Sequence, residues 1–170
     1  MIVVEHKIRD IIATMPLIRI NDTVSNKPFF HWGGKAELNR YLKAQAKSGT
    51  KPYPLIYLLP SNTIQSGRGR LATKTCEFII ATREPRKELF NDQRYIQSFD
   101  TILNPTTDKL IQGLKKSSIS TVLNEYETFN FPNYAENDKN FTIDLWDAIK
   151  LTIEVEFNGN CLKTNAIIYT

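Results

Sequence analysis

The chain has 170 residues, of which 41% are hydrophobic and 24% are charged, and this composition excludes a wholly disordered protein. Its 22 basic and 18 acidic side chains leave a net charge of +4, which is too small to indicate a nucleic-acid-binding protein by itself. Because no run approaches 18 apolar residues and no signal peptide is visible, we expect one soluble domain over residues 1–170, in a cytosol-like compartment and without a membrane partner.

The first predicted element is an amphipathic helix that ends at Pro16. Its apolar positions recur with the helical period and form one stripe: Val4, Ile8, Ile11, Ile12 and Met15. Residues 17–20 predict a short strand. Residues 21–34 are rich in turn formers and predict a loop, and residues 36–46 predict a second helix.

Two strands are predicted in the middle of the chain. Residues 55–59 form a continuous apolar run, which is typical of a central strand covered by helices. Residues 71–82 alternate and predict a second strand. The residues between them, 61–70, contain two glycines and two arginines and predict an extended polar hairpin loop that reaches beyond the body of the domain.

The C-terminal half begins with a long helical pattern over residues 92–116. Five apolar side chains keep one helical phase: Ile96, Phe99, Leu103, Leu110 and Leu114. Pro105 lies within this phase and predicts a kinked helix or two stacked helices. Strict alternation over residues 149–157 predicts an antiparallel strand with one solvent face, and residues 162–170 predict a short edge strand or an arm that docks elsewhere. The predicted fold class is α+β, a mainly antiparallel sheet packed against two or three helices.

No catalytic, cofactor or metal site is predicted. The glycine-rich residues 66–70 lead into a strand and not into the helix that a phosphate site requires. Cys76 and Cys161 have no ligand-type neighbours, so metal-site spacing is absent. Four acidic residues lie in and near the last strand and are candidates for a magnesium site: Asp144, Asp147, Glu154 and Glu156. Glu154 and Glu156 alternate with apolar positions, however, which is typical of a solvated strand face and disfavours the metal site.

The aromatic side chains Phe29, Phe30 and Trp32 in the expected loop have three interpretations. They form a small core of their own, anchor a protein partner, or stack on nucleic-acid bases. A polar hairpin loop adds no stability within its own domain, and exposed aromatics lower solubility unless they are covered. Six residues are therefore candidates for an interface with other subunits: Phe29, Phe30, Trp32, Ile64, Arg68 and Arg70.

Three segments in this order carry a family resemblance. After the N-terminal helix, residues 53–60 (YPLIYLLP), residues 78–82 (FIIAT) and a long helical stretch over residues 94–114 with a central proline resemble tail-completion proteins of tailed bacteriophages. The resemblance implies a non-enzymatic virion protein, made in the host cytoplasm, that forms a six-fold or twelve-fold ring at the head–tail junction or the top of the tail.

The resemblance also implies partners. These are further copies of the chain and the neighbouring portal, adaptor or tail proteins, which the long hairpin touches. Arg68 and Arg70 then pair with carboxylates of a neighbour or contact DNA in the central channel without sequence preference. Two alternatives come from other classes: a metal-dependent nucleic-acid enzyme, and a small monomeric adaptor that binds proteins.

Overall fold

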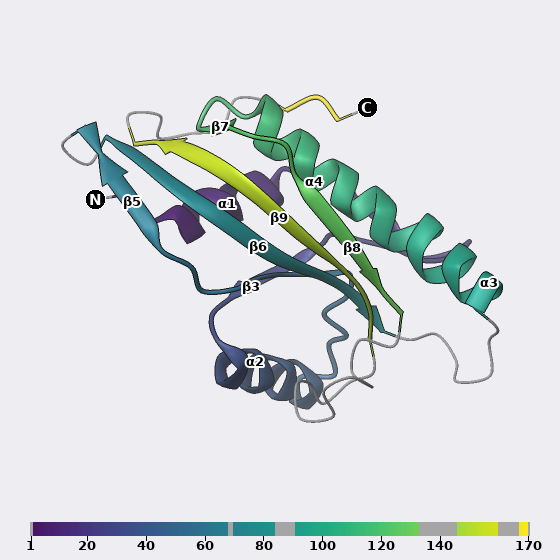
Figure 1. Cartoon of the computed structure of the whole chain (residues 1–170). Coiled ribbons are helices and arrows are strands. Elements are labelled where there is room, and N and C mark those ends of the chain that lie inside the picture. Colours follow the sequence, from purple (N-terminus) through teal and green to yellow (C-terminus); the bar gives the residue numbers. More distant parts are fainter. Residues whose placement is uncertain (1, 68–69, 84–90, 133–145, 160–166, 170) are drawn as a thin grey trace.

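The computed structural model describes residues 2–67, 70–83, 91–132, 146–159 and 167–169. Its centre is a mixed seven-stranded sheet of order β3–β4–β6–β9–β7, with β5 alongside β6 and β8 alongside β9 (Figure 1). The strands are β3 (Phe29–Trp32), β4 (Leu55–Leu58), β5 (Thr63–Ser66), β6 (Leu71–Arg83), β7 (Ser120–Val122), β8 (Glu127–Phe131) and β9 (Trp146–Asn158). The predicted α+β fold is confirmed, with the difference that β3 and β4 run parallel.

The long antiparallel strands β6 and β9 form the middle of the sheet. Cys76 lies opposite Ile153 and Phe78 lies opposite Leu151, so the apolar side chains of both strands share one face. From Lys150 onward, the alternate residues of β9 are half-buried on the other face. The predicted strand with one apolar and one solvated face is thereby confirmed.

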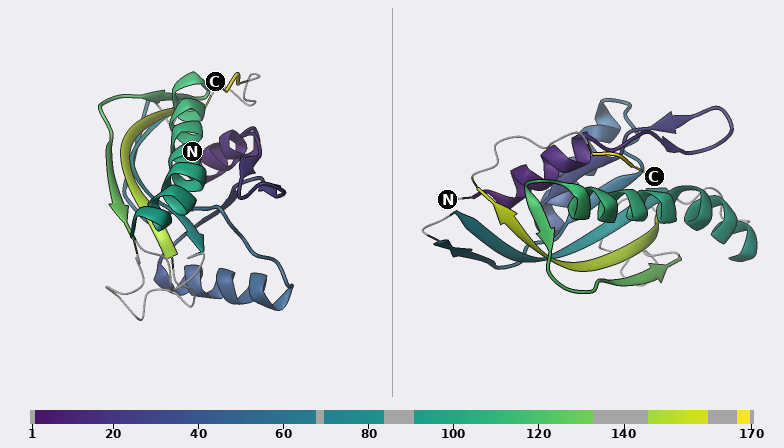
Figure 2. Two further views of the ribbon diagram at one scale, coloured as in Figure 1. Left: turned by 90° about the vertical axis from the view of Figure 1, so that its right-hand side faces the viewer. Right: turned by 90° about the horizontal axis from the view of Figure 1, so that it is seen from above.

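Several helical segments pack on one face of the sheet, and α2 covers part of the other (Figures 1 and 2). On the first face lie α1 (Val4–Ala13), α3 (Asn91–Arg94), the π-helix η2 (Tyr95–Leu103) and α4 (Asn104–Lys116). On the second face, α2 (Lys35–Lys47) buries Leu38 and Leu42 against β4, β6 and β9. The stripe predicted for the first helix is confirmed, since all five of its side chains are buried.

The predicted helical phase is wrong at Ile96, which is 60% exposed, whereas Phe99, Leu103 and the two leucines of α4 are buried. The cause is the π-helix, in which hydrogen bonds span five residues, as from the N–H of Asn104 to the oxygen of Phe99. These wider turns rotate Ile96 away from the sheet. Pro105 lies in the first turn of α4, where its missing N–H costs little, so the helical run continues through it.

Two predicted loops contain strands. Within residues 21–34, Ser25–Asn26 (β2) pairs with Ile18–Arg19 (β1) as a hairpin, and β3 follows as an edge strand of the main sheet. Within residues 61–70, β5 pairs with β6. The loop prediction for residues 21–34 is wrong, because pairing with β4 imposes extended backbone on a sequence whose own composition favours turns. The predicted hairpin of residues 55–59 and 71–82 is confirmed by the antiparallel pairing of β4 with β6, but residues 63–66 of its connection form β5.

A charged pair lies inside the core that the first helix covers. Lys74 occupies the apolar face of β6, its side chain is 3% exposed, and its Nζ lies 2.6 Å from Oε1 of Glu5 on α1. Burial raises the pKa of Glu5, but the hydrogen bond and charge of Lys74 lower it more, so this pKa lies below its ordinary value of 4.5. The ammonium of Lys74 is therefore neutralised by a carboxylate that reaches it from the covering helix.

The C-terminal residues 167–169 dock on the helices of their own chain. The hydroxyl of Tyr169 lies 2.9 Å from Oγ1 of Thr14, and Nζ of Lys116 donates a 2.9 Å hydrogen bond to the oxygen of Ile168. These three residues form no strand. Of the two interpretations of the C-terminal end, the structure therefore shows a docked segment for the residues that it describes.

Candidate assembly surface

The predicted aromatic residues lie on an edge strand and not on a loop. Phe30 and Trp32 point to the face covered by α1, where their rings stack with centroids 5.6 Å apart and the His6 ring meets Trp32 edge-on at 6.0 Å. Phe29 packs on the other face, against the core beneath α2. All three side chains are half-buried. They lie at the edge of the sheet, with α1 on one face and α2 on the other.

His31, between these aromatics, joins β3 to α2. Its ring stacks on Tyr41 with centroids 4.4 Å apart, and its Nε2 lies 3.0 Å from Oε1 of Glu37. This hydrogen bond, helped by the charge of Arg40, lowers the pKa of Glu37. Beneath them, burial and the charge of Glu37 raise the pKa of Tyr57 to about 12. The cluster fixes α2 against β3 and keeps the side chains of β3 in place.

The backbone of β3 presents an open edge. The N–H groups of Phe29 and Gly33 donate to Pro54 and Leu58 on the β4 side, at 2.9 and 3.1 Å. Since backbone groups alternate in direction along a strand, those of Phe30 and Trp32 face away from β4. No described strand pairs with this side of β3. An open edge with half-buried aromatic side chains favours pairing with a further strand.

The other predicted interface residues lie elsewhere in the sheet. Ile64 on β5 is 69% exposed, and Arg70 is exposed just before β6 begins. Arg68 lies outside the described residues. Because β5 pairs with residues 71–74 of β6 while β4 pairs with residues 78–81, the structure does not bring Ile64 and Arg70 together with the aromatics of β3. The predicted residues therefore form two separate surfaces.

The sequence analysis missed β8, at the opposite edge of the sheet. Four of its five residues are exposed, and Phe129 among them is 55% exposed. Just before it, Leu123 and Tyr126 are 44% and 40% exposed. No described strand pairs with its outer side. The signal in the sequence was the alternation of Phe129 and Phe131 with polar residues, which is typical of a strand.

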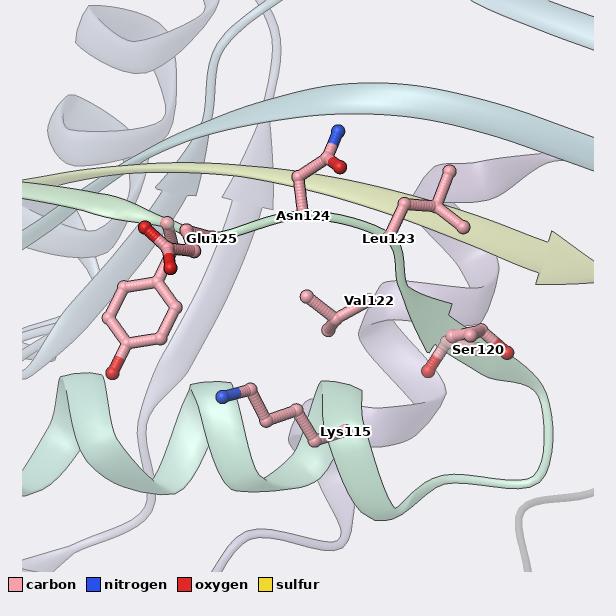
Figure 3. A pocket seen from close by; sticks show the side chains of 8 residues that line it. Lys115, Ser120, Val122, Leu123, Asn124 and Glu125 are labelled. Carbon is pink, nitrogen blue, oxygen red and sulfur yellow. The ribbon is translucent and has the colours of Figure 1, made fainter.

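An open groove of about 910 Å³ lies between the end of α4 and the chain that leads from β7 to β8 (Figure 3). It is lined by Lys115, Ser120, Thr121, Val122, Leu123, Asn124, Glu125 and Tyr126. Nζ of Lys115 lies 5.0 Å from the centroid of the Tyr126 ring. With one cation above an aromatic ring and apolar side chains beside them, the groove suits contact with a side chain of a partner protein.

The described residues contain no group of three His, Cys, Asp or Glu side chains placed to hold a metal ion. Of the acidic residues weighed above, Asp147 is buried, Glu154 and Glu156 are half-buried, and Asp144 lies outside the described residues. In the part of the chain that the structure describes, no helix is long and apolar enough to cross a membrane. Comparison of the sequence with protein-family models and with curated proteins gave no match.

Proposed function

We propose that this protein is a structural subunit of a tailed-bacteriophage virion, where it forms a ring at the head–tail junction or the top of the tail. The observation that supports this proposal is a sheet whose two edge strands, among the residues that the structure describes, have no partner on their outer sides. One edge, β3, carries half-buried aromatics, and the other, β8, carries the exposed Phe129. Open edges and exposed aromatic side chains are characteristic of surfaces that other chains cover.

The position of these edges favours a ring. Two different surfaces on opposite sides of one subunit give head-to-tail contacts, which close into rings when the rotation between neighbours divides a full circle. The resemblance of the sequence to tail-completion proteins, which form such rings, is the second reason for this proposal. The exposed Ile64 and Arg70 and the groove beside Lys115 lie away from β3 and remain available for portal, adaptor or tail proteins.

Native mass spectrometry and negative-stain microscopy of the purified protein test this proposal. We expect a closed ring of six or twelve copies. A protein that stays monomeric over the whole accessible concentration range contradicts the proposal and favours the monomeric adaptor. Magnesium-dependent cleavage of DNA or RNA by the same preparation favours the enzyme instead.

A contact between Arg70 and DNA in the channel has a separate test. If this contact forms, the affinity of the protein for DNA should not depend on the DNA sequence. The affinity should also fall steeply as the salt concentration rises, because phosphate contacts release counterions. Fluorescence anisotropy with a labelled duplex at several salt concentrations measures this dependence. Arg70→Gln should weaken the binding and reduce the salt slope, and an unchanged slope excludes the contact.

A further inference from the structure

We infer that β8 of one copy of the chain pairs antiparallel with β3 of the next copy, so that the sheet continues from subunit to subunit. The inference rests on the proposed function, since it requires several copies. The strand that covers each edge belongs to a second copy of this chain. Three properties of the two edges support it: their level in the sheet, their direction and their outward-facing groups.

The two edge strands lie at the same level of the sheet. Following the paired residues from strand to strand, Phe30 leads through Ile56, Ile80 and Ile149 to Asn130. In the same way, a second row begins at Trp32 and ends at Thr128: Trp32, Leu58, Phe78, Leu151 and Thr128. When a second subunit is generated by rotation about an axis roughly along the strands, its β3 therefore lies level with β8 of the first subunit. No shift along the strands is needed.

The strand directions also match. β4 is antiparallel to β6, β6 to β9, and β9 to β8, while β3 is parallel to β4. Within one subunit, β3 and β8 consequently point in opposite directions. Rotation about an axis that lies roughly along the strands keeps these directions, so β8 and the neighbour's β3 meet as an antiparallel pair. Antiparallel pairing is also the more stable arrangement per residue.

The outward backbone groups are complementary. On the β9 side that faces β7 and β8, the oxygen of Glu154 accepts from Leu123, and Asn158 donates to Ile119, so the even-numbered residues of β9 bond in this direction. Their partners in β8 are Glu127, Phe129 and Phe131. Alternation then leaves the backbone groups of Thr128 and Asn130 facing outward. Thr128 lies in the same row as Trp32, and Asn130 lies in the same row as Phe30. In the proposed pair, the outward N–H and C=O groups of β8 therefore lie opposite the outward groups of the neighbour's β3.

The side chains fit this pairing. Phe129 lies on the same face of the sheet as His31, and Phe131 on the same face as Phe29, because each pair ends one row of paired residues. Pairing with the next copy places the exposed Phe129 beside His31, which already stacks on Tyr41. Aromatic cross-strand neighbours stabilise antiparallel pairs. The exposed Phe129 of one subunit is thereby covered by the His31 and Tyr41 rings of the next subunit.

A disulfide across this contact tests the inference. In a Cys161→Ser background, in which Cys76 is buried, we would introduce His31→Cys and Phe129→Cys together. Within one chain these positions are four strand spacings apart, or about 19 Å, which no disulfide spans. Mild oxidation should therefore give a ladder of covalent multimers on a non-reducing gel, ending at the size of the ring. Each single variant should give no ladder.

Proline substitutions supply a matched pair of variants. Thr128→Pro removes an outward N–H of β8 and spares its bonds to β9, so it should leave a folded monomer and abolish rings in native mass spectrometry. Thr63→Pro makes the same change at an outward position of β5 and should leave the rings intact. Circular dichroism and thermal melts verify that both variants fold, and if Thr128→Pro does not fold, the cysteine ladder decides.

The outcomes separate the inference from the proposed function. A ladder from the double-cysteine variant, with rings lost in Thr128→Pro and kept in Thr63→Pro, supports the pairing. Rings in the wild type without a ladder, or rings that persist in Thr128→Pro, overturn the pairing and leave the ring in place. A wild-type chain that is monomeric throughout overturns both.

Discussion

Removal of the carboxylate that faces the buried Lys74 should destabilise the protein strongly. Glu5→Gln leaves the ammonium of Lys74, which is 3% exposed, without its counter-charge. Breaking a buried pair from one side costs about 3–5 kcal/mol, and because Glu5 itself is 23% exposed, water can reach the site and we expect about 2–3 kcal/mol. Lys74→Met instead removes the buried charge and keeps the side-chain volume, so its cost should stay below about 1.5 kcal/mol.

Urea unfolding followed by circular dichroism measures both single variants and the double variant, which together give the coupling energy of the pair. Lys150 and Glu77 on the solvated face supply the control. Their ion pair is 2.8 Å long, but their side chains are 35% and 39% exposed, so Lys150→Met should cost about 0–1 kcal/mol. The reasoning is refuted if Lys74→Met costs as much as Glu5→Gln.

The same pair should make stability depend on pH. The pKa of Glu5 is lower in the folded chain than its ordinary value of 4.5. Its contribution is therefore fully present above pH 4.5 and is lost as the pH falls through the folded-state value. The difference in unfolding free energy between the wild type and Glu5→Gln should accordingly shrink below pH 4.5, and a constant difference would contradict the assignment.

Two further substitutions test the packing of the helices. Gly113→Ala places a methyl group 2.9 Å from Cγ2 of Ile11 where α4 meets α1, so it should cost about 1–3 kcal/mol in urea unfolding. Gly34→Ala meets open space, so its cost should stay below about 1 kcal/mol and come only from alanine being a poorer N-cap of α2 than glycine. Equal effects at the two glycines would argue against the α1–α4 contact. Glu37→Gln should lower the melting temperature above pH 4.5 and have less effect below it, because the hydrogen bond with His31 lowers the pKa of Glu37 in the folded state. A melting-temperature difference that is unchanged down to pH 3 would show that this bond does not form.

The elements with strong periodicity could be predicted from the sequence. The stripe from Val4 to Met15 and the alternation from Ile149 to Phe157 match buried faces because one helix and one strand each bury a single side. Ile96 could not be placed correctly, since the π-helix that rotates it outward leaves no trace in the spacing of apolar residues. The pairing of Lys74 with Glu5 could not be predicted, because the two residues lie 69 positions apart in the sequence.

The candidate surface was less predictable than the fold. Phe29 and Trp32 were recognised as unusual, yet their strand is fixed by a parallel partner 26 residues further along, and turn-forming neighbours hide it. The sheet edge at Phe129 emerged only from the structure, because exposure at an edge depends on which strands pair and in what order. Residue types thus led us to expect a contact surface, and the topology showed which two strands lie at the edges of the described sheet.

The division of the buried residues between two faces has a consequence for motion. The core beneath α2 is the smaller of the two and is separated from the other by the sheet itself (Figure 2). Detachment of α2 therefore exposes fewer apolar side chains than detachment of the helices on the opposite face. Local opening takes less free energy than global unfolding, so we expect α2 to open more readily than the helices on the opposite face. Since α2 also supports His31 and its neighbours in β3, such an opening would change the environment of the edge strand together with that of the strands beneath α2.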